Sequence, residues 1–270
     1  MATDVARRTR SVVFYAVAGV ATLLTALLTV GATGSLFAGN LSDDGFIAAV
    51  AHIPWLALCY CAAFATMLRR PARRPAAYQQ ALATAVSMYV GALVAGENDP
   101  ILFIGFGVVL VTLGLTHPAR SALFRPGHGG ISPVLVPMAL VAAAPLALYS
   151  ARITAELPDT TGPDGVFYTG IAALALTIPF VAFVAGVRAP GSRLPLWSAG
   201  ISLVVLCGAS LVATEAASAM PAWAAVTGVV GGALFVAAGE WEQRRAQRTR
   251  SSGPSTASAQ PSRSGTADRA

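Results

Sequence analysis

The sequence contains no lysine, and charged residues of any kind are scarce. All 18 basic residues are arginine, and charged residues make up 11% of the 270 positions, against about 25% in an ordinary soluble domain. Without lysine the chain cannot form a retinal or pyridoxal Schiff base, or a P-loop phosphate clamp. Three cysteines and three histidines are too few for a multi-ligand metal framework. We therefore expect no metal and no cofactor.

The sequence is dominated by long apolar runs. Hydrophobic residues make up 55% of the chain, and a transmembrane helix needs about 20 mostly apolar residues in a row. Eight charge-free stretches predict an all-α bundle of eight transmembrane helices: 11–37, 46–68, 78–96, 101–116, 131–150, 166–187, 196–214 and 222–239. We expect a cytoplasmic N-terminus at 1–10, a transmembrane domain at 11–242 and a disordered basic cytoplasmic tail at 243–270.

The arginines are unevenly distributed between the two ends of the predicted bundle. Of the 18, only Arg152 falls outside the N-terminus, the tail and the second, fourth and sixth connecting segments. The positive-inside rule makes the arginine-rich side cytoplasmic, so both termini are predicted to face the cytoplasm from a plasma membrane. The basic charge thus reflects topology, and no nucleic-acid partner is expected. The expected partner is the lipid bilayer, with anionic headgroups at the inner loops and the tail.

Short sequence matches relate the two halves of the chain. Leu-Val-Ala at 93–95 recurs at 211–213, an offset of 118, and Gly-Val-Val at 107–109 recurs at 228–230, an offset of 121. The turn between the matching spans is three residues longer in the second half, which accounts for the difference. The matches favour two parallel four-helix halves related by an axis along the membrane normal. Chance is the alternative in a chain so rich in Ala, Val, Leu and Gly.

One candidate polar site is predicted on the outer side. His52 is the only ionisable side chain within a predicted span, and Glu97 and Glu215 end the third and seventh spans on that same side. A histidine facing carboxylates could bind a cation or form a proton-sensitive gate. The alternative is that His52 bonds a neighbouring backbone carbonyl while the glutamates reach into interfacial water.

A second candidate lies in the cytoplasmic loop after the fourth span. Arg120, Arg125 and His128 accompany a Gly-rich turn there. Guanidinium groups and backbone amides suit a phosphate or a lipid headgroup, although the glycines match neither a P-loop nor a dinucleotide fingerprint. The alternative is an ordinary positively charged loop with a flexible turn. No catalytic constellation can be assigned in the sequence, so an enzyme is not the favoured interpretation.

Small and hydroxyl-bearing residues recur at helical spacing in two spans. Threonines one turn apart share a face of the first span: Thr22, Thr25, Thr29 and Thr33. They could line a polar path, but such stripes more commonly pack, with each hydroxyl bonded to a carbonyl one turn back. Gly228 and Gly232 in the eighth span predict a close helix contact.

The segment Thr116-His117-Pro118-Ala119-Arg120 and the arginine-only, Ala-, Val- and Gly-rich spans after it resemble functionally uncharacterised multi-pass membrane proteins of high-GC actinobacteria. The resemblance implies a plasma-membrane location and carries over no catalytic residue. Two functions are favoured equally: a small-solute permease or channel, and a noncatalytic subunit or sensor that packs against a partner. A membrane enzyme acting on a lipid-linked substrate is the third hypothesis.

Overall fold

The described residues form a bundle of α-helices in this computed structural model, which describes 2–38, 41–95, 100–124, 130–156 and 163–251. The helices are α1 (Ala2–Phe37), α2 (Asp43–Pro54), α3 (Ala62–Arg69), α4 (Pro75–Ala95), α5 (Pro100–Thr116), α6 (Leu135–Glu156), α7 (Pro163–Gly186), α8 (Arg193–Val212) and α9 (Ala222–Ser251). A π-helical segment, η1 (Trp55–Cys61), joins α2 to α3. Short 3-10 turns, η2 (Pro71–Arg73) and η3 (Arg120–Ala122), lie in loops. No strand occurs within the described ranges, and the predicted all-α class is confirmed.

Six helical segments among the described residues are long and apolar enough to cross a membrane. They are α1, the continuous α2–η1–α3, and α6 to α9. The apolar part of α5, Ile104–Thr116, is shorter. In α4, Gln79 and Gln80 lower the mean hydropathy of an otherwise apolar 21-residue helix. Length and composition thus support a membrane protein with six crossing helices and do not confirm the predicted count of eight.

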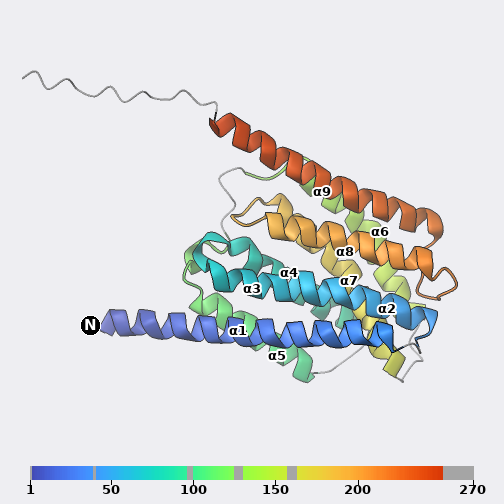
Figure 1. The fold of residues 1–270 in the computed structure, drawn as a ribbon, viewed down its shortest axis with the longest axis horizontal. Helices are drawn as coiled ribbons and strands as arrows, with labels where there is room; N and C mark the ends of the chain where they lie inside the picture. Colours follow the sequence, from blue (N-terminus) through green and yellow to red (C-terminus); the bar gives the residue numbers. More distant parts are fainter. Residues whose placement is uncertain (1, 39–40, 96–99, 125–129, 157–162, 252–270) are drawn as a thin grey trace, which may run out of the picture.

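The helices lie side by side with their axes roughly aligned, and α1 and α9 form opposite sides of the bundle (Figure 1). The beginning of α1 and the end of α9 lie at the same end (Figure 1). Helix α7 is central, because it packs against α2, α4, α6 and α8. Large side chains fill the interior: Phe14, Tyr60, Phe64 and Met67 are fully buried, and the Tyr60 ring lies 4.9 Å from that of Phe106.

Helix α9 runs nine residues beyond position 242, where we expected a disordered tail to begin. Residues 243–251, which we expected to be disordered, are therefore helical in the structure. Arg, Gln and Ala are good helix formers, and the Arg245 guanidinium lies 4.0 Å from the centroid of the Trp241 ring one turn earlier, a contact that supports helix in this segment. Residues 252–270 of the predicted tail lie outside the described residues.

The threonine stripe of α1 is a packing feature. The hydroxyls of Thr22, Thr25, Thr29 and Thr33 donate to carbonyl oxygens four residues earlier, at 2.7, 2.8, 2.7 and 2.8 Å. Because each hydroxyl is satisfied by its own helix, the stripe does not need a polar path beside it. This is the alternative that the sequence favoured.

The glycines of α9 lie against α8, as predicted. A Cβ on Gly232 would lie 2.8 Å from the carbonyl oxygen of Gly200, and a Cβ on Gly228 would overlap the Cys207 side chain. Only glycine allows the two backbones to approach this closely. The pair of glycines therefore sets the spacing of the α8–α9 hairpin.

Candidate functional site

A fully buried glutamine, Gln80, joins α4 to two other elements. Its Nε2 donates to the carbonyl oxygens of Leu58 (2.8 Å) and Cys59 (3.2 Å) in η1, and to Oγ of Ser198 in α8 (3.2 Å). Since both backbone neighbours are acceptors, the amide nitrogen must face them and the amide oxygen must point elsewhere. That oxygen is buried and has no hydrogen-bond partner among the described atoms.

The π-helical geometry of η1 explains why a carbonyl is available to Gln80. The segment begins directly after Pro54, which has no N–H to continue the α-helical ladder. In η1 the N–H of Ala62 bonds the oxygen of Ala57, five residues back. The N–H of Ala62 therefore bypasses the oxygen of Leu58, which it would engage in an α-helix, and that oxygen accepts from Gln80. Such π-bulges occur frequently at functional sites.

One turn along, hydroxyl groups from the same two helices surround a thiol. Cys59 Sγ lies 3.9 Å from Ser202 Oγ of α8, and the Thr84 side chain of α4 is its other polar neighbour. Cys59 is 1% exposed. We call the group of Gln80, Thr84, Ser198, Ser202 and Cys59 the polar seam. It runs between α4 and α8 and against η1.

Residues that meet at this centre are separated by a constant number of positions. Gln80 bonds Ser198, 118 residues later. His52 of α2 packs so tightly against Gly170 of α7, again 118 residues later, that a Cβ on the glycine would overlap its ring. Thr84 and Ser202, the two hydroxyl residues beside Cys59, are also 118 positions apart. Contacts between residues 118 positions apart thus recur at this centre.

Contacts farther from the centre follow the same relation. Tyr89 of α4 faces Gly107 of α5, and Cys207 of α8 faces Gly228 of α9. Cys207 lies 118 positions after Tyr89, and Gly228 lies 121 positions after Gly107. Helix α4 packs against α7, and α8 packs against α2 and η1. The short sequence matches have the same offsets, 118 and 121, as these contacting residues.

Unpaired buried polar atoms concentrate at η1. The described residues contain five buried side-chain polar atoms without a partner, and three of them are Trp55 Nε1, Tyr60 Oη and Gln80 Oε1. The first two residues belong to η1, and the third is bonded to it. Buried polar groups are nearly always hydrogen-bonded, and exceptions call for an explanation. The seam is therefore the strongest functional candidate in the described part of the chain.

The predicted outer site is only partly described. His52 Nδ1 lies 2.7 Å from the Ala48 carbonyl oxygen, which is the contact that the structural alternative required. Glu215 is exposed on the turn between α8 and α9. Glu97 lies outside the described residues, so the convergence of these three residues stays a prediction.

An unforeseen polar clamp closes the same end of the bundle. Asp44 Oδ1 accepts from the backbone N–H of Ser218 (2.8 Å) and from its hydroxyl (2.6 Å), and Oδ2 accepts from the N–H of Ala217 (3.3 Å). From α6, Arg152 donates to the Ala217 oxygen (2.8 Å) and the Tyr149 hydroxyl to the Ser218 oxygen (2.7 Å). This clamp ties the turn before α9 to both α2 and α6.

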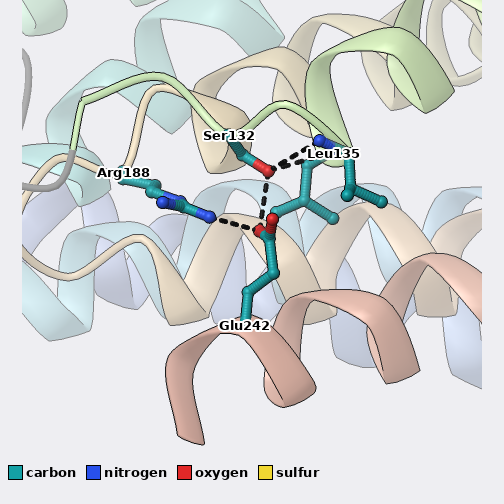
Figure 2. Close-up of polar contacts among 5 residues, drawn as sticks. Ser132, Leu135, Arg188 and Glu242 are labelled. Atoms are coloured by element: carbon teal, nitrogen blue, oxygen red, sulfur yellow. Dashed lines mark hydrogen bonds and ion pairs between the residues drawn. The ribbon is translucent and has the colours of Figure 1, made fainter. Parts of the chain in front are cut away.

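A second polar cluster lies at the other end of α6, where Ser132 precedes the helix (Figure 2). The Ser132 hydroxyl accepts from the N–H of Leu135 (2.9 Å) and donates to Glu242 Oε2 (2.7 Å). Arg188 Nη2 lies 2.6 Å from the same oxygen, although its backbone has a φ of 54°, in the left-handed region. Figure 2 shows Glu242 reaching from α9 toward the start of α6, where a negative charge is stabilised by the helix dipole.

The predicted inner site is not assembled by the described residues. Arg120 is exposed in η3, while Arg125 and His128 lie outside the described residues, so their grouping stays a prediction. Sequence reasoning missed Gln80. The available signal was a pair of glutamines inside an apolar helix, where polar side chains are costly and often functional.

No group of three or more His, Cys, Asp or Glu that could hold a metal ion occurs among the described residues. No family model matches the chain, and no curated protein or solved structure matches it significantly. The residues of the seam and of the clamp at Asp44 are therefore the basis for proposing a function.

Proposed function

We propose that the chain is an eight-span plasma-membrane protein made of two parallel four-helix halves, α1–α5 and α6–α9, with both termini cytoplasmic. The constant offset and the contacts between counterpart residues support this arrangement. The remaining two spans are then α4 and α5, whose counterparts α8 and α9 are both apolar enough to cross. Four spans per half leave the halves parallel, with the axis along the membrane normal.

We further propose that the protein is a permease for a small, neutral, polar solute and that the polar seam binds it. The observation that carries this proposal is the unpaired Gln80 oxygen between the two halves, beside a helix broken by η1. Transporters built from repeats bind substrate at the repeat interface, beside discontinuous helices. The seam residues carry no charge, so hydroxyl or amide donors on the solute suit the Gln80 oxygen and the seam hydroxyls.

The two halves also meet at the ends of the seam, where gates are required. At the outer end, the clamp joins Asp44 of the first half to Ser218 of the second. At the inner end, the N–H of Ala76 donates to the Pro190 oxygen at 3.3 Å. There Gly191, with a φ of 90°, lies so close to Arg74 that a Cβ would be 3.2 Å from its Cα. In this proposal one closure opens while the other holds, as in alternating access.

Two native thiols make a matched test. Cys59 lies in the seam, and Cys207 lies between α8 and α9; both are 1% exposed. We would retain one thiol at a time, replacing the other two cysteines with alanine. Each full-length protein would be treated in sealed, oriented vesicles with a small, charged, membrane-impermeant thiol reagent, from each side separately.

A permease whose seam opens to water should expose Cys59 to the reagent from at least one side, at a rate about tenfold or more above that of Cys207. A tenfold difference between the labelling rates of Cys59 and Cys207 distinguishes opening of the seam from fluctuations that expose both thiols. Equal protection of both thiols from both sides would refute the permease proposal. Single cysteines at positions 215 and 120 would test the orientation, because only the first should react from outside.

A second candidate, a noncatalytic subunit or sensor, is favoured by the filled interior and by an exposed small-residue face. Tyr60 and Phe64 are fully buried at the centre. On α1, Gly31 and Gly34 have open space beside them, with nothing within 4 Å of a Cβ placed there. Small residues of this kind let another transmembrane helix approach closely. Protection of Cys59 from both sides is the outcome that this candidate predicts.

A further inference from the structure

A basic hollow opens at the end of the bundle where α3 finishes. It has a volume of about 500 Å³ and is lined by Tyr15, Arg69, Arg70, Pro71, Arg73 and Pro118, among others. Tyr15 comes from α1, Arg69 ends α3, and Pro71 and Arg73 belong to η2. Because α1 packs against both α3 and α5, the hollow lies where three elements of the first half meet. These elements hold it in shape.

The three arginines of this hollow have no negative partner. Their side chains are exposed and make no hydrogen bond or ion pair with the described residues. The sequence contains no Asp or Glu between Asp44 and Glu97, so neighbouring positions supply no carboxylate either. Three guanidinium groups around one concave surface repel one another, and a bound anion would relieve that repulsion.

The corresponding place in the second half is neutralised by the protein itself. Arg188, 118 positions after Arg70, pairs with Glu242 at 2.6 Å, and Arg193 pairs with Glu240 at 2.6 Å. With the offset of 121 that relates α5 to α9, the positions matching Glu240 and Glu242 are Ala119 and Ser121. The first half thus lacks the carboxylates that the second half supplies at the same place.

We propose that this hollow binds the phosphate of an anionic membrane lipid, which replaces the missing carboxylates. Guanidinium groups bind phosphate through paired N–H donors. The hollow opens beside Tyr15, and past it α1 exposes apolar side chains such as Val20 (67% exposed) and Leu23 (63% exposed). A lipid can place its headgroup among the arginines and its acyl chains along this face, whereas a soluble phosphate can use only the arginines.

The test uses the full-length protein in a neutral detergent, with phosphatidylglycerol as probe and phosphatidylcholine as the zwitterionic reference. Bound lipid would be counted by native mass spectrometry. The test variant carries R69Q, R70Q and R73Q, and the control variant loses the same charge at exposed positions outside the hollow through R8Q, R10Q and R244Q. Each basic side chain near an anionic headgroup is worth about a fivefold factor in binding, so the test variant should bind phosphatidylglycerol roughly 100-fold more weakly.

Three outcomes decide the matter. Loss of phosphatidylglycerol binding in the test variant, with the control within about threefold of the unmodified protein, supports the proposal. Equal losses in both variants would show that overall charge alone attracts lipid and would overturn it. Displacement of the lipid by an equal concentration of inorganic phosphate would assign the hollow to a soluble anion and would also overturn it. A further variant, R69K, R70K and R73K, keeps the loop charge that sets membrane orientation; it should bind more strongly than the glutamine variant.

Discussion

Replacing Gln80 with leucine tests whether the seam is kept for function rather than for stability. Leucine, whose side chain is one atom shorter, removes both the donor and the unpaired acceptor. The amide nitrogen has three acceptors within 3.2 Å, but it carries only two protons, so two good bonds are lost. Hydrogen bonds between transmembrane helices average about 0.6 kcal/mol each, and the loss is therefore about 1.2 kcal/mol.

The same substitution removes a buried oxygen that has no partner. Leaving such a group unpaired costs about 1–3 kcal/mol. The balance predicts that the unfolding free energy of the Gln80→Leu protein is unchanged or raised by up to about 2 kcal/mol. Residues that lower stability and are nevertheless retained are typical of functional sites. The thiol assay should show the functional cost as slower labelling of Cys59, because the seam loses its strongest attraction for water.

Unfolding would be followed in mixed micelles by helix content, with Thr84→Val as the matched control. The Thr84 hydroxyl donates to the backbone carbonyl oxygen of Gln80 at 2.9 Å, so valine should cost about 0.5 kcal/mol with no compensating gain. If Gln80→Leu lowered the unfolding free energy by more than about 2 kcal/mol, the reasoning would be refuted. The amide would then be a structural cross-link whose unpaired oxygen does not destabilise the protein.

Three further changes have expected results. Asp44→Asn should weaken the bonds to Ser218, lower the unfolding free energy by about 1–3 kcal/mol and raise labelling of the seam from outside; unchanged labelling would exclude the clamp as a gate. Gly232→Ala should cost about 1–3 kcal/mol, since the new Cβ would lie 2.8 Å from a backbone oxygen of α8, whereas Gly231→Ala, with nothing within 4 Å, should not destabilise the protein. Burial of His117 just after α5 lowers its pKa from 6.5 to about 4, so the unfolded state takes up more protons between these values. The unfolding free energy should therefore fall by up to about 3 kcal/mol as the pH drops from 6.5 to 4. A His117→Asn protein whose pH profile matched the unmodified one would exclude this cause.

Helix positions could be predicted from the sequence, because a continuous apolar run in a bilayer must form a helix that satisfies its own backbone hydrogen bonds. Each predicted span overlaps one helix of the structure or, for 46–68, one continuous run of helical elements, α2–η1–α3. The interpretation of the threonine stripe and of Gly228 and Gly232 also held, because i and i+4 spacing places side chains on one face whatever the neighbouring helix is. The helical stretch beyond position 242 was not foreseen, because Arg, Gln and Ala are good helix formers and can continue a helix beyond the apolar run.

The candidate site was harder to predict from the sequence than the helix positions. The sequence singled out His52, whose ring lies against Gly170 and whose Nδ1 contacts a backbone oxygen. Gln80 was missed, because its one signal in the sequence is that of a polar residue in an apolar helix. The amide nitrogen of Gln80 donates to three acceptors on residues 21 to 118 positions away, and this orientation leaves the amide oxygen unpaired. The importance of Gln80 depends on these long-range contacts.

The sequence by itself determined the helical class, the apolar runs, the asymmetry of the arginines and the two offsets of 118 and 121, because these are local or additive properties of the chain. The tertiary structure decided which residues meet. It brought Gln80 onto Ser198, and it paired Arg188 with Glu242 while leaving Arg70 without a carboxylate. Such pairings depend on distance between helices, and distance is set by packing of side chains that are far apart in sequence.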